Sequence, residues 1–133
     1  DKTQYNGIKM GKDGVLSNGD IIKNSKLTEP KPNDIIYAYC SDTCYYPKII
    51  DLINECDILY HESTFLDKHI ELANRTKHST AKQAAEIARL ANVKKLILGH
   101  FSSRYNNLND FQSQAQEVFN NVELASDGKV FNF

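Results

Sequence analysis

From residue 35 onward, short apolar runs alternate with segments of helical periodicity. The runs of strand length lie at 35–40, 57–62 and 95–100, followed by two predicted closing strands near 122–125 and 129–133. The predicted helices cover 47–54, 65–75, 79–92 and 108–119. Strands that alternate with helices in this way indicate an α/β layered fold.

The helix that begins near Thr80 has the clearest sequence signals. Thr80 and Gln83 have the spacing of a capping box, in which each residue satisfies a backbone N–H at the start of the helix. Small residues recur along one face, at Ala81, Ala84, Ala85, Ala88 and Ala91. A face of this kind predicts a helix that packs closely against a sheet.

The N-terminal part of the chain has a different texture. Residues 1–22 contain four of the six glycines and read as a hairpin or irregular ribbon. Residues 23–34 are polar, contain two prolines and predict a surface loop. We expect the whole chain, 1–133, to form one partial domain.

Composition narrows the class of protein. With 41% hydrophobic and 25% charged residues, the 133-residue chain is typical of a globular segment, and no apolar run reaches the roughly 20 residues of a membrane helix. Three irregularly spaced cysteines argue against a disulfide framework and favour a reduced, cytoplasmic location. The formal net charge of −1 gives no support for RNA binding, which would have to rest on a local cluster.

Polar residues follow directly after the predicted strands. Asp42 follows the first strand, His61 and Glu62 end the second, His100 ends the third, and Asp127 follows the fourth. The carboxyl ends of neighbouring strands in an α/β sheet form the edge where ligands bind. Aspartate oxygen and histidine nitrogen together suit zinc, manganese or iron in hydrolytic sites.

Each of these residues also has an ordinary structural explanation. An aspartate at a strand end is commonly a turn former or a helix cap, and a histidine after a buried strand is commonly just hydrogen-bonded. Catalytic zinc normally has three protein ligands and a water, so Asp42 and His100 by themselves predict at most half of a metal site.

Five motifs, taken in order, carry a resemblance to a known family: SDT (41–43), HEST (61–64), HST (78–80), GHFSSRY (99–105) and ASDG (125–128). In sequence and approximate spacing they resemble the second half of ribonuclease Z, a metallo-β-lactamase-superfamily enzyme that trims the 3′ ends of precursor tRNAs. The resemblance extends over roughly residues 5–133. It implies the C-terminal half of an αββα sandwich, with a mixed sheet covered by helices.

The resemblance also implies roles for individual residues. Asp42 matches the aspartate that bridges two metal ions, and His100 matches the last histidine ligand. Glu62 and His78 match the pair that protonates the departing 3′ oxygen, and Arg104 matches a residue that holds RNA phosphate. We expect Glu62 to lie within hydrogen-bonding reach of His78.

The chain departs from the family at the other half of the metal site. The HxHxDH cluster is absent, as is a further histidine ligand, so only Asp42 and His100 remain of the metal ligands. We therefore expect a longer gene product in which two zinc ions, with manganese as the alternative, support endonucleolytic cleavage of precursor tRNA. That protein would be a cytoplasmic homodimer, and this chain alone would be inactive.

Two other functions fit part of the pattern. One is a different phosphodiesterase or esterase of the same superfamily, against which HST and HFSSRY count. The other is a non-catalytic module that binds RNA or dimerises. An HxHxDH cluster in the upstream coding sequence would favour the enzyme over the binding module.

Overall fold

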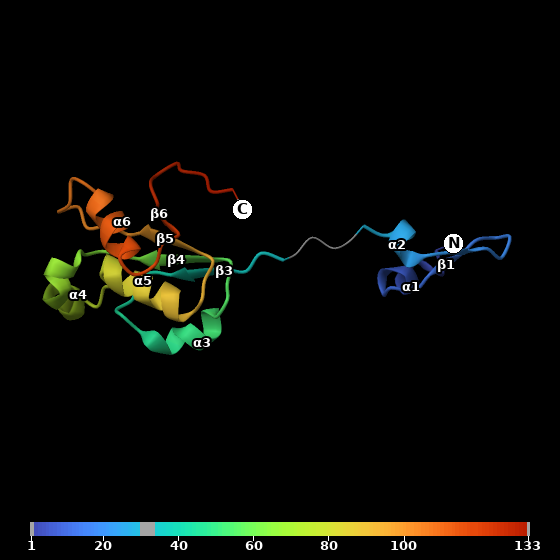
Figure 1. The fold of residues 1–133 in the computed structure, drawn as a ribbon, viewed down its shortest axis with the longest axis horizontal. Coiled ribbons are helices and arrows are strands. Elements are labelled where there is room, and N and C mark those ends of the chain that lie inside the picture. Colours follow the sequence, from blue (N-terminus) through green and yellow to red (C-terminus); the bar gives the residue numbers. More distant parts are fainter. Residues whose placement is uncertain (1, 30–33, 133) are drawn as a thin grey trace. The chain divides into compact units, whose positions relative to one another are not determined.

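The computed structural model describes residues 2–29 and 34–132, and the chain divides into two compact units, Asp1–Asp34 and Ile35–Phe133 (Figure 1). The second unit holds every predicted site residue, and the expectation that residues 1–133 form one partial domain stays a prediction. None of the helices among the described residues is long and apolar enough to cross a membrane.

The N-terminal unit is built on a small antiparallel hairpin. Strands β1 (Gly14–Val15) and β2 (Ile21–Ile22) pair, and helices α1 (Tyr5–Lys9) and α2 (Asn24–Leu27) lie on either side of them in sequence. Gly19 adopts a φ of 91° in the turn, a conformation that glycine reaches at no steric cost. The hairpin was predicted, whereas α2 occupies part of the predicted 23–34 loop, whose residues 30–33 lie outside the described residues.

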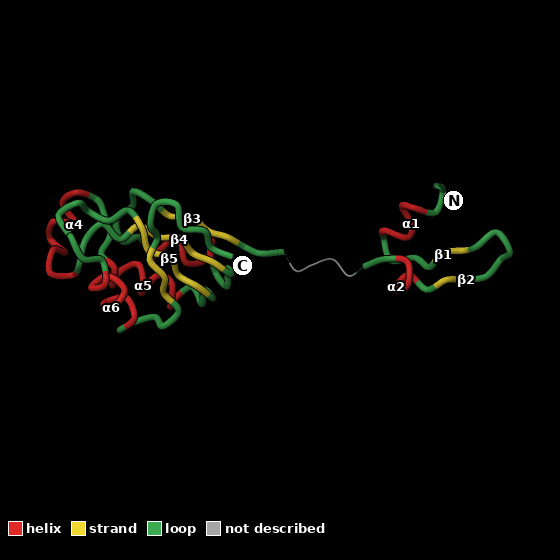
Figure 2. The backbone as a smooth tube through the Cα atoms, turned by 90° about the horizontal axis from the view of Figure 1, so that it is seen from above, coloured by secondary structure: helices red, strands yellow, loops and turns green. Residues whose placement is uncertain are grey.

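The second unit contains a four-stranded sheet in the order β3-β4-β5-β6, with β3 to β5 side by side in Figure 2. The strands are β3 (Tyr37–Cys40), β4 (Ile58–Glu62), β5 (Lys95–Gly99) and β6 (Val122–Leu124). The connecting helices are η1 (Pro47–Ile49), α3 (Ile50–Ile53), η2 (Asp67–His69), α4 (Ile70–Thr76), α5 (Ala81–Leu90) and α6 (Asn109–Gln116).

The sheet differs from the expectation in two respects. All its described ladders are parallel, where a mixed sheet was expected, because a helix-containing connection joins each strand to the next. The second predicted closing strand does not form within 129–132, and residue 133 lies outside the described part. Instead Gly128 turns the chain at a φ of 77°, and Lys129 Nζ donates to the carbonyl of Leu124.

Helices cover one face of the sheet and form the core. The small-residue face of α5 is fully buried, as the alanine spacing predicted, and packs with Leu59, Leu96 and Leu98 of the central strands. The predicted capping box is present: Gln83 N donates to Thr80 Oγ1, and Thr80 N donates to the Gln83 side chain. The cap therefore fixes where α5 begins, next to the HST motif.

The opposite face is open on the β3 side. The side chains of Tyr37 and Tyr39 are 52% and 63% exposed, and the Tyr39 ring stacks on Tyr60 with centroids 4.7 Å apart. Alternation along each strand places these tyrosines away from the helices. An aromatic sheet face of this kind is what a second layer of structure would cover.

Candidate metal and proton-transfer site

The carboxyl ends of the parallel strands bring the predicted residues together. In the ladders Cys40 is paired with His61, and Glu62 is paired with Gly99. Asp42 and His100 therefore emerge at one edge of the sheet. Asp42 Oδ1 lies 3.1 Å from His100 Nε2, so the two side chains converge as the sequence predicted.

Both residues adopt a left-handed backbone conformation, with φ of 49° at Asp42 and 58° at His100. Aspartate and histidine enter this region more readily than most residues, but it still costs energy, on the order of 1–3 kcal/mol at each position. The conformation turns each side chain sharply off the end of its strand. Strain of this kind concentrates at functional sites.

His78 is the third member of the cluster. One potential ligand atom from each of Asp42, His78 and His100 lies within 4.8 Å of the others. The His78 and His100 rings are stacked, with centroids 5.3 Å apart. The side chains of Asp42 and His100 are 73% and 41% exposed, so the cluster is open to solvent in this chain.

Glu62 is the buried centre of the site. Its carboxylate has no exposed surface and accepts hydrogen bonds through both oxygens. Oε1 accepts from Thr43 N at 2.9 Å and from His78 Nδ1 at 2.7 Å. Oε2 accepts from Thr64 N at 3.1 Å, Thr64 Oγ1 at 2.7 Å and Ser79 N at 3.2 Å. One carboxylate thus joins the three segments that form the site, and the expected contact with His78 is present.

These hydrogen bonds decide the charge of Glu62. Burial alone would raise the pKa of the carboxyl, but the bonds donated by Thr64, His78 and Ser79 outweigh it and hold the pKa below its usual value. Glu62 is therefore an ionised carboxylate at neutral pH. It can orient an imidazole and stabilise positive charge on it.

His61 supports the edge from inside. It is fully buried, and its Nδ1 donates to the Glu62 carbonyl at 2.7 Å. Burial lowers the pKa of the imidazole, so His61 is neutral. Its Nε2 has no partner among the described residues.

Arg104 lies beside the cluster. Its guanidinium sits over the Phe65 ring, 5.2 Å from the centroid, and Phe65 in turn contacts the edge of His78. Arg104 Nε donates to Ser102 Oγ at 3.1 Å. Within residues 2–29 and 34–132 no acidic side chain pairs with Arg104, so its remaining donors can meet an outside anion.

Three neighbouring residues contribute less to the site. Asp127 lines a hollow beside His100, together with Tyr60 and Phe101. Cys40 and Cys44 are free thiols, and in the described part of the chain only Asp42, His78 and His100 form a group suited to a metal. Burial raises the pKa of Cys40, which disfavours the thiolate that a metal would require.

The donor set fits a divalent transition metal. One carboxylate oxygen and imidazole nitrogens are the ligands that zinc and manganese sites use. Their convergence on a solvent-open edge supplies part of a coordination sphere, because three to four protein ligands are usual.

Sequence reasoning missed Thr64. Its hydroxyl lies 2.7 Å from Glu62 Oε2 and 2.9 Å from His100 Nδ1, so it joins the two halves of the cluster. Only its place two residues after Glu62, in the HEST motif, could have pointed to it.

The chain is similar to curated proteins named ribonuclease Z. No protein-family model matches the chain. A ribonuclease Z of Parabacteroides distasonis is 45% identical over 121 residues, which is 91% of this chain and 40% of that protein. A ribonuclease Z of Phocaeicola vulgatus is 47% identical over 122 residues, 92% of this chain and 40% of the relative. The chain therefore spans about two fifths of the length of the curated relatives it matches.

A solved structure shows the fold. The metallo-β-lactamase fold protein YhfI of Bacillus subtilis superposes on 71% of this chain and 39% of its own, with a TM-score of 0.67 and 24% sequence identity. The metallo-β-lactamase-like α/β architecture is thus confirmed, as is the resemblance of this sequence to ribonuclease Z.

Proposed function

We propose that these residues are part of a metal-dependent endoribonuclease that removes 3′ trailers from precursor tRNA. The products would be a tRNA with a 3′-hydroxyl and a trailer with a 5′-phosphate. The observation that carries the proposal is the convergence of Asp42, His78 and His100 above the buried Glu62, in a chain similar to ribonuclease Z over nine tenths of its length.

Asp42 and His100 are the residues that would hold metal, with zinc as the proposed ion. A bound divalent metal would supply Lewis acidity and a hydroxide nucleophile at neutral pH. His78 is a third potential ligand at this edge, but we assign it to proton transfer. The remaining ligands would come from outside this chain, because in the described residues no further histidine, cysteine or carboxylate joins this group. We also propose a cytoplasmic homodimer, on the strength of the resemblance alone.

His78 is the proposed proton donor. Its Nδ1 donates to Glu62 Oε1, which fixes the ring and leaves Nε2 directed away from the carboxylate. The ionised Glu62 thereby orients the ring that would act as general acid. A proton from Nε2 to the departing 3′ oxygen then turns a poor leaving group into a hydroxyl, an effect of roughly 10²–10⁴-fold.

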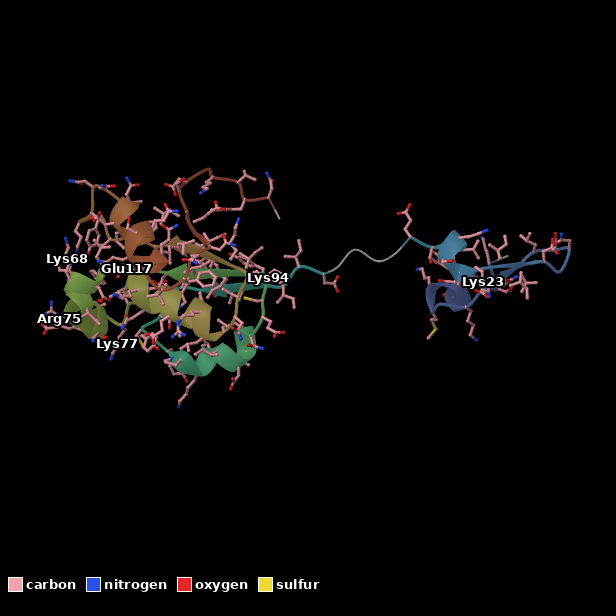
Figure 3. The ribbon with its side chains drawn as sticks, viewed as in Figure 1. Lys23, Lys68, Arg75, Lys77, Lys94 and Glu117 are labelled. Atoms are coloured by element: carbon pink, nitrogen blue, oxygen red, sulfur yellow. The ribbon has the colours of Figure 1, made fainter. Side chains whose placement is uncertain are left out.

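Positive charge near the site supports an RNA substrate. Arg104 offers a guanidinium fork that suits phosphate oxygens. Three exposed cations on and beside α4, Lys68, Arg75 and Lys77, are labelled in Figure 3, and Lys77 directly precedes His78. None of the three forms an ion pair within residues 2–29 and 34–132. Because the overall net charge is −1, RNA binding would have to rest on a local positive cluster, and these exposed cations provide one.

The test is cleavage of a precursor tRNA with a defined 3′ trailer by the full-length protein. We expect cleavage next to the mature 3′ end, abolished by Asp42→Asn and slowed at least about 100-fold by His78→Ala with little change in tRNA affinity. Asp51→Asn, at an exposed position in α3, is the matched control and should leave the rate unchanged. Intact RNA with the wild-type protein would contradict the proposal, as would equal losses of rate and affinity for His78→Ala.

A further inference from the structure

We propose that Thr64 is a positioning residue that fixes the tautomer of His100, so that Nε2 presents a lone pair to a metal ion. The inference rests on the proposed function only in taking the Asp42–His100 edge as a metal site. It concerns how that site is prepared before metal arrives, and it follows from which atoms along a short chain of hydrogen bonds can donate.

The chain begins at a group that can only accept. Glu62 is ionised, since hydrogen bonds hold its pKa below the usual value, and a carboxylate has no proton to give. Thr64 Oγ1 lies 2.7 Å from Glu62 Oε2. The single hydroxyl proton of Thr64 must therefore point toward Glu62.

The second bond follows from the first. Thr64 Oγ1 also lies 2.9 Å from His100 Nδ1. Because the hydroxyl has already donated its proton to Glu62, it can only accept from the ring. His100 Nδ1 must then carry the proton, and in the neutral imidazole the lone pair lies on Nε2.

That lone pair faces an anion. His100 Nε2 lies 3.1 Å from Asp42 Oδ1, an arrangement that two electron-rich atoms would avoid unless positive charge lies between them. A metal ion held by Asp42 and His100 would supply that charge. A carboxylate that orients a metal-binding histidine through its other nitrogen is a common arrangement, and here a threonine hydroxyl is inserted between the two.

Thr64 is buried and anchored by hydrogen bonds, so a water molecule cannot easily replace its hydroxyl. It is only 7% exposed, and its carbonyl accepts from Ser102 N at 3.1 Å. The preceding residue, Ser63, donates its N–H to the Gly99 carbonyl at 2.8 Å. The segment that carries Thr64 is thus attached on both sides to the segment that carries His100, which keeps the hydroxyl and the ring in register.

The first experiment compares metal affinity in the full-length protein, measured by competition between Zn²⁺ binding and a chromogenic chelator. Thr64→Val keeps the shape but removes the hydroxyl, and we expect a loss of about 10–100-fold in affinity. Thr64→Ser keeps the hydroxyl and should restore affinity to within about threefold of the wild type. Thr76→Val, which removes an exposed hydroxyl bonded to the Leu72 carbonyl, is the control and should have no effect.

Two outcomes of this comparison would overturn the proposal. If Thr64→Val binds Zn²⁺ as tightly as the wild type, the hydroxyl does not prepare His100. If Thr64→Ser loses as much affinity as Thr64→Val, the methyl group and not the hydroxyl is what matters.

The second experiment needs no change at Thr64 and so remains decisive if Thr64→Val does not fold. Long-range ¹H–¹⁵N correlation spectra of histidine-labelled, metal-free protein at alkaline pH report which ring nitrogen carries the proton, with His100 assigned from a His100→Gln variant. We expect the Nδ1–H form. A proton on Nε2, alone or together with Nδ1, would overturn the inference.

Neither readout involves RNA. If the wild-type protein fails to cleave precursor tRNA while the tautomer and the affinity series behave as expected, the proposed function fails and the role of Thr64 stands. If cleavage occurs and the tautomer is reversed, the function stands and the role of Thr64 fails.

Discussion

Asp42 and His100 hold their side chains at the sheet edge in a backbone conformation that most residues avoid. β3 ends two residues before Asp42, and β5 ends one residue before His100. The fully buried carboxylate of Glu62 fixes His78 directly and His100 through Thr64. At the scale of residues, the site is a buried anion that orients exposed groups.

Arg104→Ala in the full-length protein should raise the Michaelis constant for precursor tRNA and lower the slope of log affinity against log salt by about one phosphate contact. The reason is that its guanidinium is exposed beside His78 and has no acidic partner among the described residues. Arg89→Ala, at the exposed end of α5, should change neither quantity. An unchanged salt slope for Arg104→Ala would assign the side chain to packing on Phe65.

The buried imidazole of His61 should make stability depend on pH. Burial lowers its pKa in the folded state below the ordinary 6.5, so below that pH the unfolded chain takes up a proton that the folded chain does not. Stability then falls as pH falls, by at most about 1.4 kcal/mol per pH unit for one group.

His61→Asn keeps a donor near the Glu62 carbonyl and removes the titration. Urea unfolding of the full-length protein between pH 7.5 and 5.5 should show a smaller loss of stability for this variant than for the wild type. Equal losses would mean that His61 is protonated in the folded state. The carboxyl of Glu62, whose pKa is lowered from 4.5, contributes to acid instability only below this window.

The sequence alone could identify most of the candidate site residues but not all of them. Asp42, Glu62, His78 and His100 were identifiable from strand ends and motifs, and the structure brings them together. Their catalytic and metal-binding roles stay predictions. Thr64 was not identifiable, because a hydroxyl acquires its role from the direction of two hydrogen bonds, which no residue pattern records.

At the scale of elements, parallel strands place the site. The ladders of β3, β4 and β5 end within a residue or two of one another, so each connecting loop starts at the same edge. Gly99, the last residue of β5, lies against the side chain of Tyr60. A Cβ at Gly99 would overlap the ring and hydroxyl of Tyr60.

Gly99→Ala should therefore lower the free energy of unfolding by about 1–3 kcal/mol, as overpacking does elsewhere. In a Tyr60→Ala background the same change should cost less, which a double-mutant cycle by urea unfolding would measure. Gly7→Ala, whose added Cβ would meet only ordinary contact with Lys12, is the control. Full additivity of the two changes would show that Tyr60 is not what excludes a side chain at Gly99.

Elements were predictable where local signals and packing agree. The capping box and alanine spacing predicted α5 correctly. The capping residues determine where the helix begins, and the alanine spacing determines which face is buried. The strand predicted at 129–133 was wrong over its described residues, because a strand needs a partner, and apolar residues do not by themselves provide one. Strand direction also depends on connections, and helical crossovers produce a parallel sheet.

At the scale of the whole molecule, the chain contains part of the proposed metal site and a sheet face with exposed tyrosines. Residues 1–133 alone should bind Zn²⁺ or Mn²⁺ weakly and should not cleave precursor tRNA. Of the three clustered residues we assign only Asp42 and His100 to metal, with His78 held by Glu62 for proton transfer, and two ligands are too few to compete with water. The exposed Tyr37 and Tyr39 should also favour self-association, which sedimentation would detect. Stoichiometric metal with measurable turnover would show that the chain builds its site from other residues.

The most direct test is anomalous diffraction at the zinc absorption edge from crystals of the full-length protein. We predict a metal peak in contact with both Asp42 and His100, with Thr64 between Glu62 and His100 as in the present structure. A zinc-loaded, active protein whose metal peaks lie away from Asp42 and His100 would contradict it.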